Sequence, residues 1–495
     1  MPEKIKFLPL FGIKSLKIMN LQEESARCLL CQDAPCTKAC ANGDPARAVR
    51  AIRFDNLKIA ARWLEGCTQE DLAAAEKACI HYDFPLRLRE IAAALPAPAP
   101  STGLPSLEID FCGIHCENPF FLASSAVCTN YEMVARAFDA GWAGVFYKTI
   151  CMQEIKEVSP RFDAVGKPFT GFRNMEQLSE NPVDVDFDIL KRLKQNYPSK
   201  VVIASIMGNT EEEWISLAKM AEEAGCDAVE LNFSCPQMRL SGMGSDVGQN
   251  AELVTFYTAF VKRSVKIPVI PKMTPNITHM SQPALGAYFA GADAISAINT
   301  IKSVTLGEGS DVNGCQTGSG YSGKAVKPIA LRHILAMAKI SIMKNVQFSG
   351  IGGIETWRDA LEFIQLGCRN VQVCTAVMQY GYRIIDDMID GMQQYMAERG
   401  IEKLDALVGE LLPKFYLPSD LDRTTVVYPK FDKEKCIGCG RCVISCSDGG
   451  HQALKFDLQT RRPQLIGSKC VGCHLCRLVC PVSAIGLSNR VKKKS

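Results

Sequence analysis

The stretch CIGCGRCVISC at residues 436–446 returns in a second form, CVGCHLCRLVC, at residues 470–480. Both follow the spacing C-x₂-C-x₂-C-x₃-C, and Pro481 comes directly after the second. This is the ligand pattern for two [4Fe–4S] clusters, each bound by three thiolates of one run and the last thiolate of the other. The predicted metal ligands are Cys436, Cys439, Cys442, Cys446, Cys470, Cys473, Cys476 and Cys480. A zinc site of paired C-x₂-C motifs is the competing interpretation, although zinc needs only four thiolates.

Composition points to a large globular protein of a reducing compartment. The chain has 495 residues, a net charge of +3, 47 % apolar residues and 23 cysteines. So many cysteines with cluster spacing indicate thiolate ligands and not disulfides, so we expect a cytoplasmic protein. The near-neutral charge predicts no nucleic-acid partner. Because no run of 18 apolar residues occurs, we also expect no membrane partner.

Changes in composition and hydrophobic pattern along the chain predict five segments. Residues 1–95 have helical periodicity and their own cysteine group, and residues 96–105 form a Pro-rich linker. Residues 106–400 alternate short apolar runs with amphipathic segments. Residues 401–426 act as a connector to a ferredoxin-type domain with two [4Fe–4S] clusters over residues 427–495. The fold class is therefore α/β, with smaller domains at both ends.

Eight apolar runs in the central segment predict parallel strands. They are Phe120–Ser124, Gly144–Thr149, Val201–Ile206, Ala228–Ser234, Val269–Thr274, Ala294–Thr300, Val346–Gly350 and Asn370–Thr375. Helical patterns lie between them, as over residues 211–224 and 356–366. Eight such units in under 300 residues indicate a (β/α)₈ TIM barrel. An open doubly wound sheet is the alternative, but it needs a Gly-rich phosphate loop after its first strand, and none is there.

Polar residues gather at the carboxyl ends of these runs, where barrel enzymes build their active sites. Lys148 and Lys272 each end an apolar run, and a buried ammonium needs an electron-rich partner. The turn over residues 350–353 has the place and composition of a barrel phosphate site. Together with two iron–sulfur clusters, these features indicate FMN, which converts between one-electron carriers and hydride chemistry.

Cys235 follows Asn232 and Ser234 at the end of the fourth apolar run and precedes a Gly-rich loop over residues 236–249. A thiol at such a lid is well placed as a general acid that enters when the lid closes. The alternative is a buried cysteine at a strand end. The sequence G-x-G-x-x-G at residues 318–323 does not follow a predicted strand, so we interpret it as a barrel loop near the flavin. With no dinucleotide domain, the electrons are expected to come from another polypeptide.

At this point several stretches resemble the dihydropyrimidine dehydrogenases, in particular their subunit that carries FMN and iron–sulfur clusters. The resemblance covers roughly residues 106–490 and includes both cysteine runs. The other stretches that carry it are Phe146–Thr149, Val158–Arg161, Asn232–Met238, Lys272–Asn276 and Ser322–Arg332.

The resemblance implies a role for each residue of the candidate site. It implies FMN contacts for Ser124, Lys148, Thr149, Lys272, Gly352, Gly353, Cys374, Thr375 and Ala376. It implies contacts with a pyrimidine base for Asn174, Asn232, Phe233, Ser234, Asn299 and Thr300. Cys235 would be the catalytic acid. Asparagine suits this substrate because its amide offers both a donor and an acceptor to alternating N–H and C=O groups.

The implied reaction is reduction of uracil or thymine to the 5,6-dihydro base. The electrons would come from NADH through a partner flavoprotein with FAD and [4Fe–4S] clusters, in a heterotetramer of two plus two subunits. A dihydroorotate dehydrogenase, which shares the barrel, FMN and a loop cysteine, is the neighbouring alternative. An electron-relay subunit with a non-catalytic barrel is an alternative from another class.

The N-terminal cysteines resemble those of the flavoprotein partner. Cys28, Cys31 and Cys36 form a tight group, and Cys79 is the distant cysteine that would complete a third [4Fe–4S] cluster. A remnant that binds nothing is the alternative.

Overall fold

Eight parallel strands form a closed barrel in this computed structural model, which describes residues 20–165, 170–236, 243–306 and 317–493. The chain divides into two compact units, residues 1–412 and residues 413–495. The first holds the barrel and the N-terminal helices, and the second holds the paired cysteine runs. No helix within the described ranges is long and apolar enough to cross a membrane.

The barrel strands fall on the eight predicted runs, so the predicted fold class is confirmed. They are β3 (Phe120–Leu122), β4 (Gly144–Phe146), β7 (Val201–Ile206), β8 (Ala228–Asn232), β9 (Val269–Lys272), β10 (Ala294–Ala297), β13 (Gln347–Ile351) and β14 (Cys368–Val373). Their order around the barrel is β10-β13-β14-β3-β4-β7-β8-β9. Every residue of β7 and β8 is buried, which explains why these strands read as continuous apolar runs. Because the sheet closes, the open doubly wound alternative is wrong.

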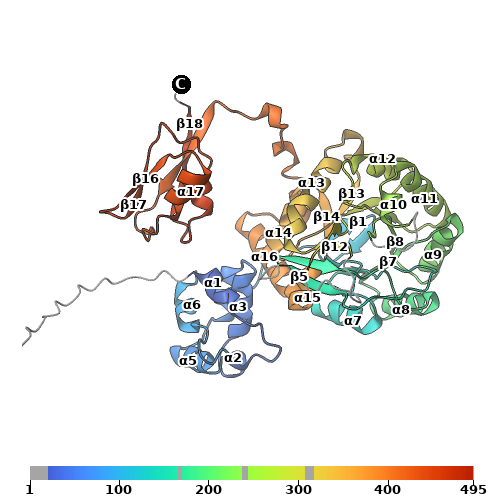
Figure 1. Cartoon of the computed structure of the whole chain (residues 1–495). Coiled ribbons are helices and arrows are strands. Elements are labelled where there is room, and N and C mark those ends of the chain that lie inside the picture. Colours follow the sequence, from blue (N-terminus) through green and yellow to red (C-terminus); the bar gives the residue numbers. More distant parts are fainter. Residues whose placement is uncertain (1–19, 166–169, 237–242, 307–316, 494–495) are drawn as a thin grey trace, which may run out of the picture. The chain divides into compact units, whose positions relative to one another are not determined.

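Helices enclose the barrel, as Figure 1 shows. They are α7 (Tyr131–Ala140), α8 (Val183–Asn196), α9 (Glu211–Glu223), α10 (Ser245–Gly248), α11 (Ala251–Ser264), α12 (Ser281–Phe289), α13 (Lys327–Ala338), α14 (Trp357–Gln365), α15 (Thr375–Tyr380) and α16 (Ile384–Glu398). Local sequence sets where they begin. Thr210 caps α9 through its side chain, and Thr356 and Asp359 form a capping box at α14.

A second, antiparallel sheet lies among the loops that follow the barrel strands. Its order is β11 (Ile301–Ser303), β12 (Ser319–Ser322), β6 (Gly171–Asn174) and β5 (Phe162–Val165). The motif at residues 318–323 therefore contains a strand where we predicted a loop. Glycines permit the close packing: a Cβ on Gly171 would lie 1.8 Å from the Tyr321 hydroxyl, and one on Gly320 would lie 2.6 Å from Thr300 Oγ1. A separate hairpin joins β1 (Ile109–Phe111) to β2 (Ile114–Cys116).

Between residue 20 and the barrel, the structure has six short helices. They are α1 (Leu21–Ala26), α2 (Pro35–Lys38), α3 (Pro45–Arg53), α4 (Leu57–Trp63), α5 (Gln69–Lys77) and α6 (Leu88–Ala94). They share an apolar core and contact α16 through ion pairs. Arg50 Nε lies 2.5 Å from Asp387 Oδ2, and Arg62 Nη2 lies 3.1 Å from Asp390 Oδ2.

The C-terminal unit is small and built around its cysteines. It contains β15 (Thr425–Phe431), α17 (Arg441–Gly449), β16 (Leu454–Asp457), β17 (Arg462–Leu465), α18 (Leu475–Leu478) and β18 (Ile485–Lys492). Strands β15 and β18 pair antiparallel, and so do β16 and β17. Cys442, Cys446 and Cys476 belong to the buried core of this unit, so the cysteines replace much of the apolar packing of an ordinary domain.

Candidate active site

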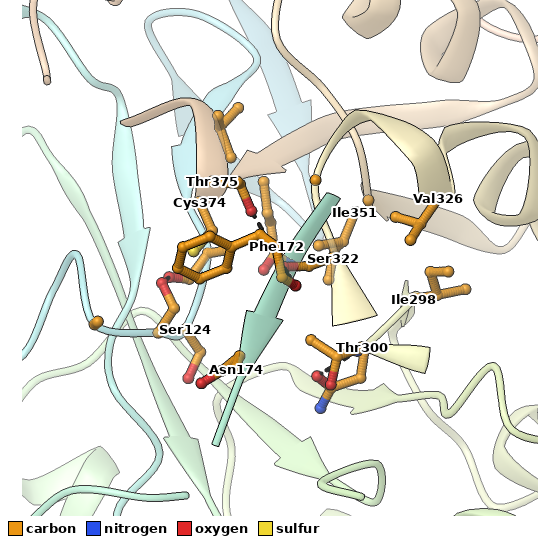
Figure 2. Close-up of a pocket in the computed structure, with 18 of the residues that line it drawn as sticks. Ser124, Phe172, Asn174, Ile298, Thr300, Ser322, Val326, Ile351, Cys374 and Thr375 are labelled. Atoms are coloured by element: carbon orange, nitrogen blue, oxygen red, sulfur yellow. Dashed lines mark hydrogen bonds between the residues drawn. The ribbon is translucent and has the colours of Figure 1, made fainter. Parts of the chain in front are cut away.

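A cavity of about 1090 Å³, open to solvent, lies at the carboxyl ends of the barrel strands. A cavity with several convergent polar groups at this end of a barrel is typical of a cofactor and substrate site. The structure brings most of the predicted site residues to its walls. The predicted residues that line it are Ser124, Lys148, Thr149, Asn174, Asn232, Cys235, Lys272, Asn299, Thr300, Gly352, Gly353, Cys374, Thr375 and Ala376. Figure 2 shows Ser124, Cys374, Asn174 and Thr300 around this cavity.

Gly352 and Gly353 form the turn that follows β13. Their φ angles are +122° and +74°, which disfavour any other residue. A Cβ on Gly353 would lie 2.7 Å from the backbone nitrogen of Lys327, so the turn also lacks space for a side chain. Thr375 continues this wall, and its hydroxyl lies 3.3 Å from that of Ser322. The turn thus offers bare backbone to the cavity, as a phosphate group requires.

Both predicted lysines are buried and paired with a carboxylate. Lys148 Nζ lies 2.8 Å from Glu176 Oε2, and Arg161 approaches the other oxygen of the same carboxylate at 3.4 Å. Lys272 Nζ lies 3.4 Å from Glu230 Oε1. Two ammonium groups therefore face the cavity, each with a partner that offsets the cost of burial.

Hydrogen bonds hold the asparagines in fixed orientations. Asn232 Nδ2 donates to Thr149 Oγ1 at 2.9 Å, and Asn232 Oδ1 accepts from Ser234 Oγ at 2.7 Å. Asn299 Nδ2 donates to Ser234 Oγ at 2.8 Å, and Asn299 Oδ1 accepts from the backbone of Thr300 at 2.7 Å. Ser234 thus joins an amide at the end of β8 to an amide that follows β10, although Ser234 itself does not line the cavity.

Cys235 lines the cavity and is 6 % exposed. Its backbone oxygen accepts a hydrogen bond from the nitrogen of Ser245, at 2.9 Å, within the second half of the predicted lid. Residues 237–242 of that lid lie outside the described residues. A second thiol, Cys151, lies near it: burial raises the pKa of Cys151 to about 11, and Cys235 contributes to the shift. Burial also raises the pKa of the cavity residue Cys374, against a hydrogen bond from Ser125.

One predicted substrate residue has a different place. The side chain of Phe233 is fully buried and packs against Trp214 and Tyr257, with ring centroids 5.1 and 6.5 Å away. It does not line the cavity. Conversely, Glu176 lines the cavity without having been predicted. The signal was available, because Glu176 follows Asn174 by two residues and Lys148 needed an anionic partner.

The C-terminal cysteines line two small cavities of about 360 and 350 Å³. The first is lined by Cys436, Cys439, Cys442 and Cys480, and the second by Cys446, Cys470, Cys473 and Cys476. Each cavity thus takes three thiols from one run and the last thiol from the other, as two interleaved clusters require.

The N-terminal cysteines also lie near one another. Burial raises the pKa of Cys36 to about 11, and the thiols of Cys28, Cys79 and Cys31 contribute to the shift. A separate pair lies nearby, since the sulfurs of Cys40 and Cys67 are 3.6 Å apart. No group of three or more His, Cys, Asp or Glu side chains in the described ranges is arranged around a single metal ion.

Comparison with known families gives two matches. The family model for dihydroorotate dehydrogenase matches residues 106–396, and that for a 4Fe-4S dicluster domain matches residues 430–487. The second match contradicts the zinc interpretation of the paired cysteine runs.

Individual proteins similar to this chain come from several sources. The NAD-dependent dihydropyrimidine dehydrogenase subunit PreA of Escherichia coli K12 is 51 % identical, over 78 % of this chain and 97 % of the relative. The chloroplastic dihydropyrimidine dehydrogenase (NADP(+)) of Arabidopsis thaliana is 37 % identical, over 64 % and 79 %. The catalytic subunit of dihydroorotate dehydrogenase B from Pyrococcus abyssi is 36 % identical, over 61 % and 98 %. The crystal structure of dihydroorotate dehydrogenase from Eimeria tenella has the same fold, with a TM-score of 0.54 and 18 % identity over 61 % of this chain and 88 % of that one.

Proposed function

The chain belongs to the dihydroorotate dehydrogenase family and within it to the dihydropyrimidine dehydrogenases, and from this premise we propose that it reduces the 5,6 double bond of uracil or thymine. Its cofactors are FMN and two [4Fe–4S] clusters, which follow from the two family matches. One observation carries the proposal: fixed amides and a cysteine line the same cavity as two buried lysines.

The cavity residues fit FMN. Gly352 and Gly353 would hold its phosphate, because their turn leaves backbone uncovered where a Cβ has no room. Lys148 and Lys272 would meet the electron-rich part of the ring system. When bound, FMN supplies hydride transfer and accepts electrons singly from the clusters.

A pyrimidine base would be held by Asn174, Asn232 and Asn299 with Thr300. Uracil has alternating N–H and C=O groups, and each amide can donate and accept. Because Ser234 and Thr149 hold the amides of Asn232 and Asn299, these groups need little reorganisation on binding. Such a set also rejects analogues that lack the matching groups, since buried polar atoms would then be left unpaired.

Cys235 would deliver the proton to C5 of the base. Its thiol lines the cavity beside the asparagine cluster, and its neighbour Ser234 is fixed by two hydrogen bonds. A positioned thiol at this place would supply the proton as a general acid.

Substrate binding tests this assignment. Uracil should perturb the flavin absorption of the holoprotein, and Asn299→Ala should weaken that binding by ~10-fold or more. The matched control is Asn196→Ala, which removes an exposed asparagine at the end of α8 whose amide donates to the Tyr131 hydroxyl at 2.7 Å. Equal uracil binding in both variants would contradict the assignment, and binding of dihydroorotate instead of uracil would favour the alternative activity.

For the electron source, we propose a partner flavoprotein subunit with FAD, NAD-binding sites and [4Fe–4S] clusters, in a heterotetramer of two plus two. NADH alone should leave the flavin of this chain oxidised, and adding the partner should reduce it. Rapid bleaching by NADH without a partner would contradict this proposal.

For the N-terminal region, we propose that Cys28, Cys31, Cys36 and Cys79 bind a third [4Fe–4S] cluster. The mutual effect of these thiols on the pKa of Cys36 supports it. The chain would then comprise a helical region over residues 1–95, a linker over 96–105, the barrel over 106–400, a connector over 401–426 and the dicluster domain over 427–495.

A further inference from the structure

Glu230 is an acidic residue inside an otherwise apolar barrel strand. It lies in the middle of β8 and is completely buried. Its Oε1 accepts from Ser205 Oγ at 2.9 Å and lies 3.4 Å from Lys272 Nζ. Its Oε2 has no hydrogen-bond partner among the residues that the structure describes. Because a buried carboxylate with an unpaired oxygen is costly, its presence here calls for a functional reason.

The position of Glu230 relative to the cavity suggests that reason. Lys272 lines the cavity whereas Glu230 does not, so the carboxylate lies behind the ammonium group. The register of the barrel supports this, since Asn232 at the end of β8 pairs with Lys272. Glu230 therefore offsets the charge that Lys272 presents to whatever occupies the cavity.

The charge of the other cavity lysine, Lys148, is offset in a different way. The carboxylate of Glu176 is shared between Lys148, at 2.8 Å, and Arg161, at 3.4 Å. Arg161 also pairs with Glu180, at 2.6 Å, so the charge of Lys148 is balanced within a network of four charged side chains. Among the ion pairs of the described residues, Lys272 is paired with Glu230 alone, so neutralising Glu230 leaves the charge of that lysine without a carboxylate partner.

Hydrogen bonds also connect Glu230 to the cavity wall. Ser205 Oγ, which donates to Glu230, lies 3.0 Å from Thr149 Oγ1. Thr149 in turn accepts from Asn232 Nδ2 at 2.9 Å and lies 3.1 Å from Ser124 Oγ. The carboxylate is thus held in one orientation by the same network that orders two cavity residues.

We propose that Glu230 is a positioning residue that holds Lys272 and lowers the reduction potential of the bound flavin. Reduction adds negative charge to the flavin, and an unbalanced ammonium favours that charge. A carboxylate behind the ammonium weakens the effect and keeps the flavin a stronger reductant. The proposal rests on bound FMN and not on which pyrimidine is reduced.

An anaerobic spectroelectrochemical titration of the holoprotein tests it. At the potential where the wild-type flavin is half reduced, Glu230→Gln should raise the ratio of reduced to oxidised flavin by ~10-fold, equivalent to about 30 mV for a two-electron couple. The matched control is Asp186→Asn, which neutralises another completely buried carboxylate that bonds Tyr147 and Asn181 and does not line the cavity. Asp186→Asn should leave the ratio unchanged.

A double-mutant cycle separates positioning from general disturbance. In a Lys272→Met background, Glu230→Gln should give a smaller shift, because the ammonium group through which the carboxylate acts is then missing. If Glu230→Gln retains no flavin, Glu230→Asp, which withdraws the charge by one methylene, should raise the potential by a smaller amount. An unchanged or lowered potential in the variant that retains flavin would overturn the proposal, as would an equal shift in Asp186→Asn or in the Lys272→Met background.

Discussion

The barrel cavity and the C-terminal cysteine cavities differ in size and in lining. The barrel cavity measures about 1090 Å³ and is lined by amides, hydroxyls and two lysines at the ends of strands. The cysteine cavities measure about 360 and 350 Å³ and are lined mainly by thiols and apolar residues. A large polar cavity can hold a cofactor and orient a substrate, whereas a small thiol-lined cavity can hold a cluster and little else. Reduction of the substrate and electron transfer through the clusters therefore depend on separate residues. A substitution in one kind of cavity should impair one of these steps and leave the other intact.

The largest effect should come from removing one cluster ligand. Cys480 and Cys436 line the same cavity. The variants Cys480→Ala and Cys436→Ala should therefore lack the same cluster, and neither should show turnover driven by the partner flavoprotein. Turnover driven by a small reduced dye at the barrel should survive. Cys446→Ala should instead match Cys470→Ala, because those two share the other cavity.

Electron paramagnetic resonance of each variant identifies which cluster remains. If the same cluster signal were absent from Cys480→Ala and from Cys470→Ala, the interleaved arrangement would be wrong.

The next effect concerns the barrel alone. Cys235→Ala should lower turnover by roughly 10²-fold or more, the usual scale for a lost general acid, while cluster content and uracil binding stay close to wild type. Steady-state kinetics with the dye as donor measures this. Cys226→Ala is the control, as a buried cysteine outside the cavity lining. Unchanged turnover in Cys235→Ala would show that another group delivers the proton.

Substitution of the N-terminal cysteines should have a smaller effect on activity. These cysteines lie near one another but do not form two complete cysteine runs like those of the C-terminal unit. A Cys28→Ala and Cys36→Ala double variant should hold two clusters where the wild type holds three. Dye-driven uracil reduction should be unaffected, because these residues do not line the barrel cavity. Iron analysis makes the measurement, and equal iron in both proteins would leave the segment as a remnant that binds nothing.

The smallest effect concerns stability at the contact between the N-terminal helices and α16. Arg50→Met would leave Asp387 buried without its partner and should cost about 3–5 kcal/mol of unfolding free energy. Arg47→Met breaks a half-exposed pair with Asp386 and should cost about 0–1 kcal/mol. Denaturant unfolding measures both, and equal losses would contradict the difference in burial.

The same contact gives a pH dependence. Burial raises the pKa of Asp387 to about 7, despite the opposing effect of Arg50. An acid with a raised folded pKa contributes less stability as pH rises from its unfolded pKa to its folded one. Arg50→Met removes the group that opposes the rise in the pKa of Asp387. The loss of unfolding free energy caused by this variant should therefore be larger at about pH 8 than at about pH 5.

The sequence predicted the barrel strands because parallel strands buried on both faces are continuous apolar runs, as at β7 and β4. It did not predict the sheet of β5, β6, β11 and β12, whose short strands contain Gly171 and Gly320 and pack through space that these glycines leave. It also missed Glu176 and Glu230. Both could have been found from the rule that revealed the lysines, since a buried charge needs a partner. Roles of single residues, such as Phe233, depend on side-chain direction that spacing alone does not give.

The most direct test of the central claim is an anaerobic turnover assay of the holoprotein with a reduced artificial electron carrier. Uracil and thymine should be reduced to their 5,6-dihydro forms, and orotate should not be reduced under the same conditions. Reduction of orotate without reduction of uracil would contradict the proposed function and assign the chain to the dihydroorotate branch of its family.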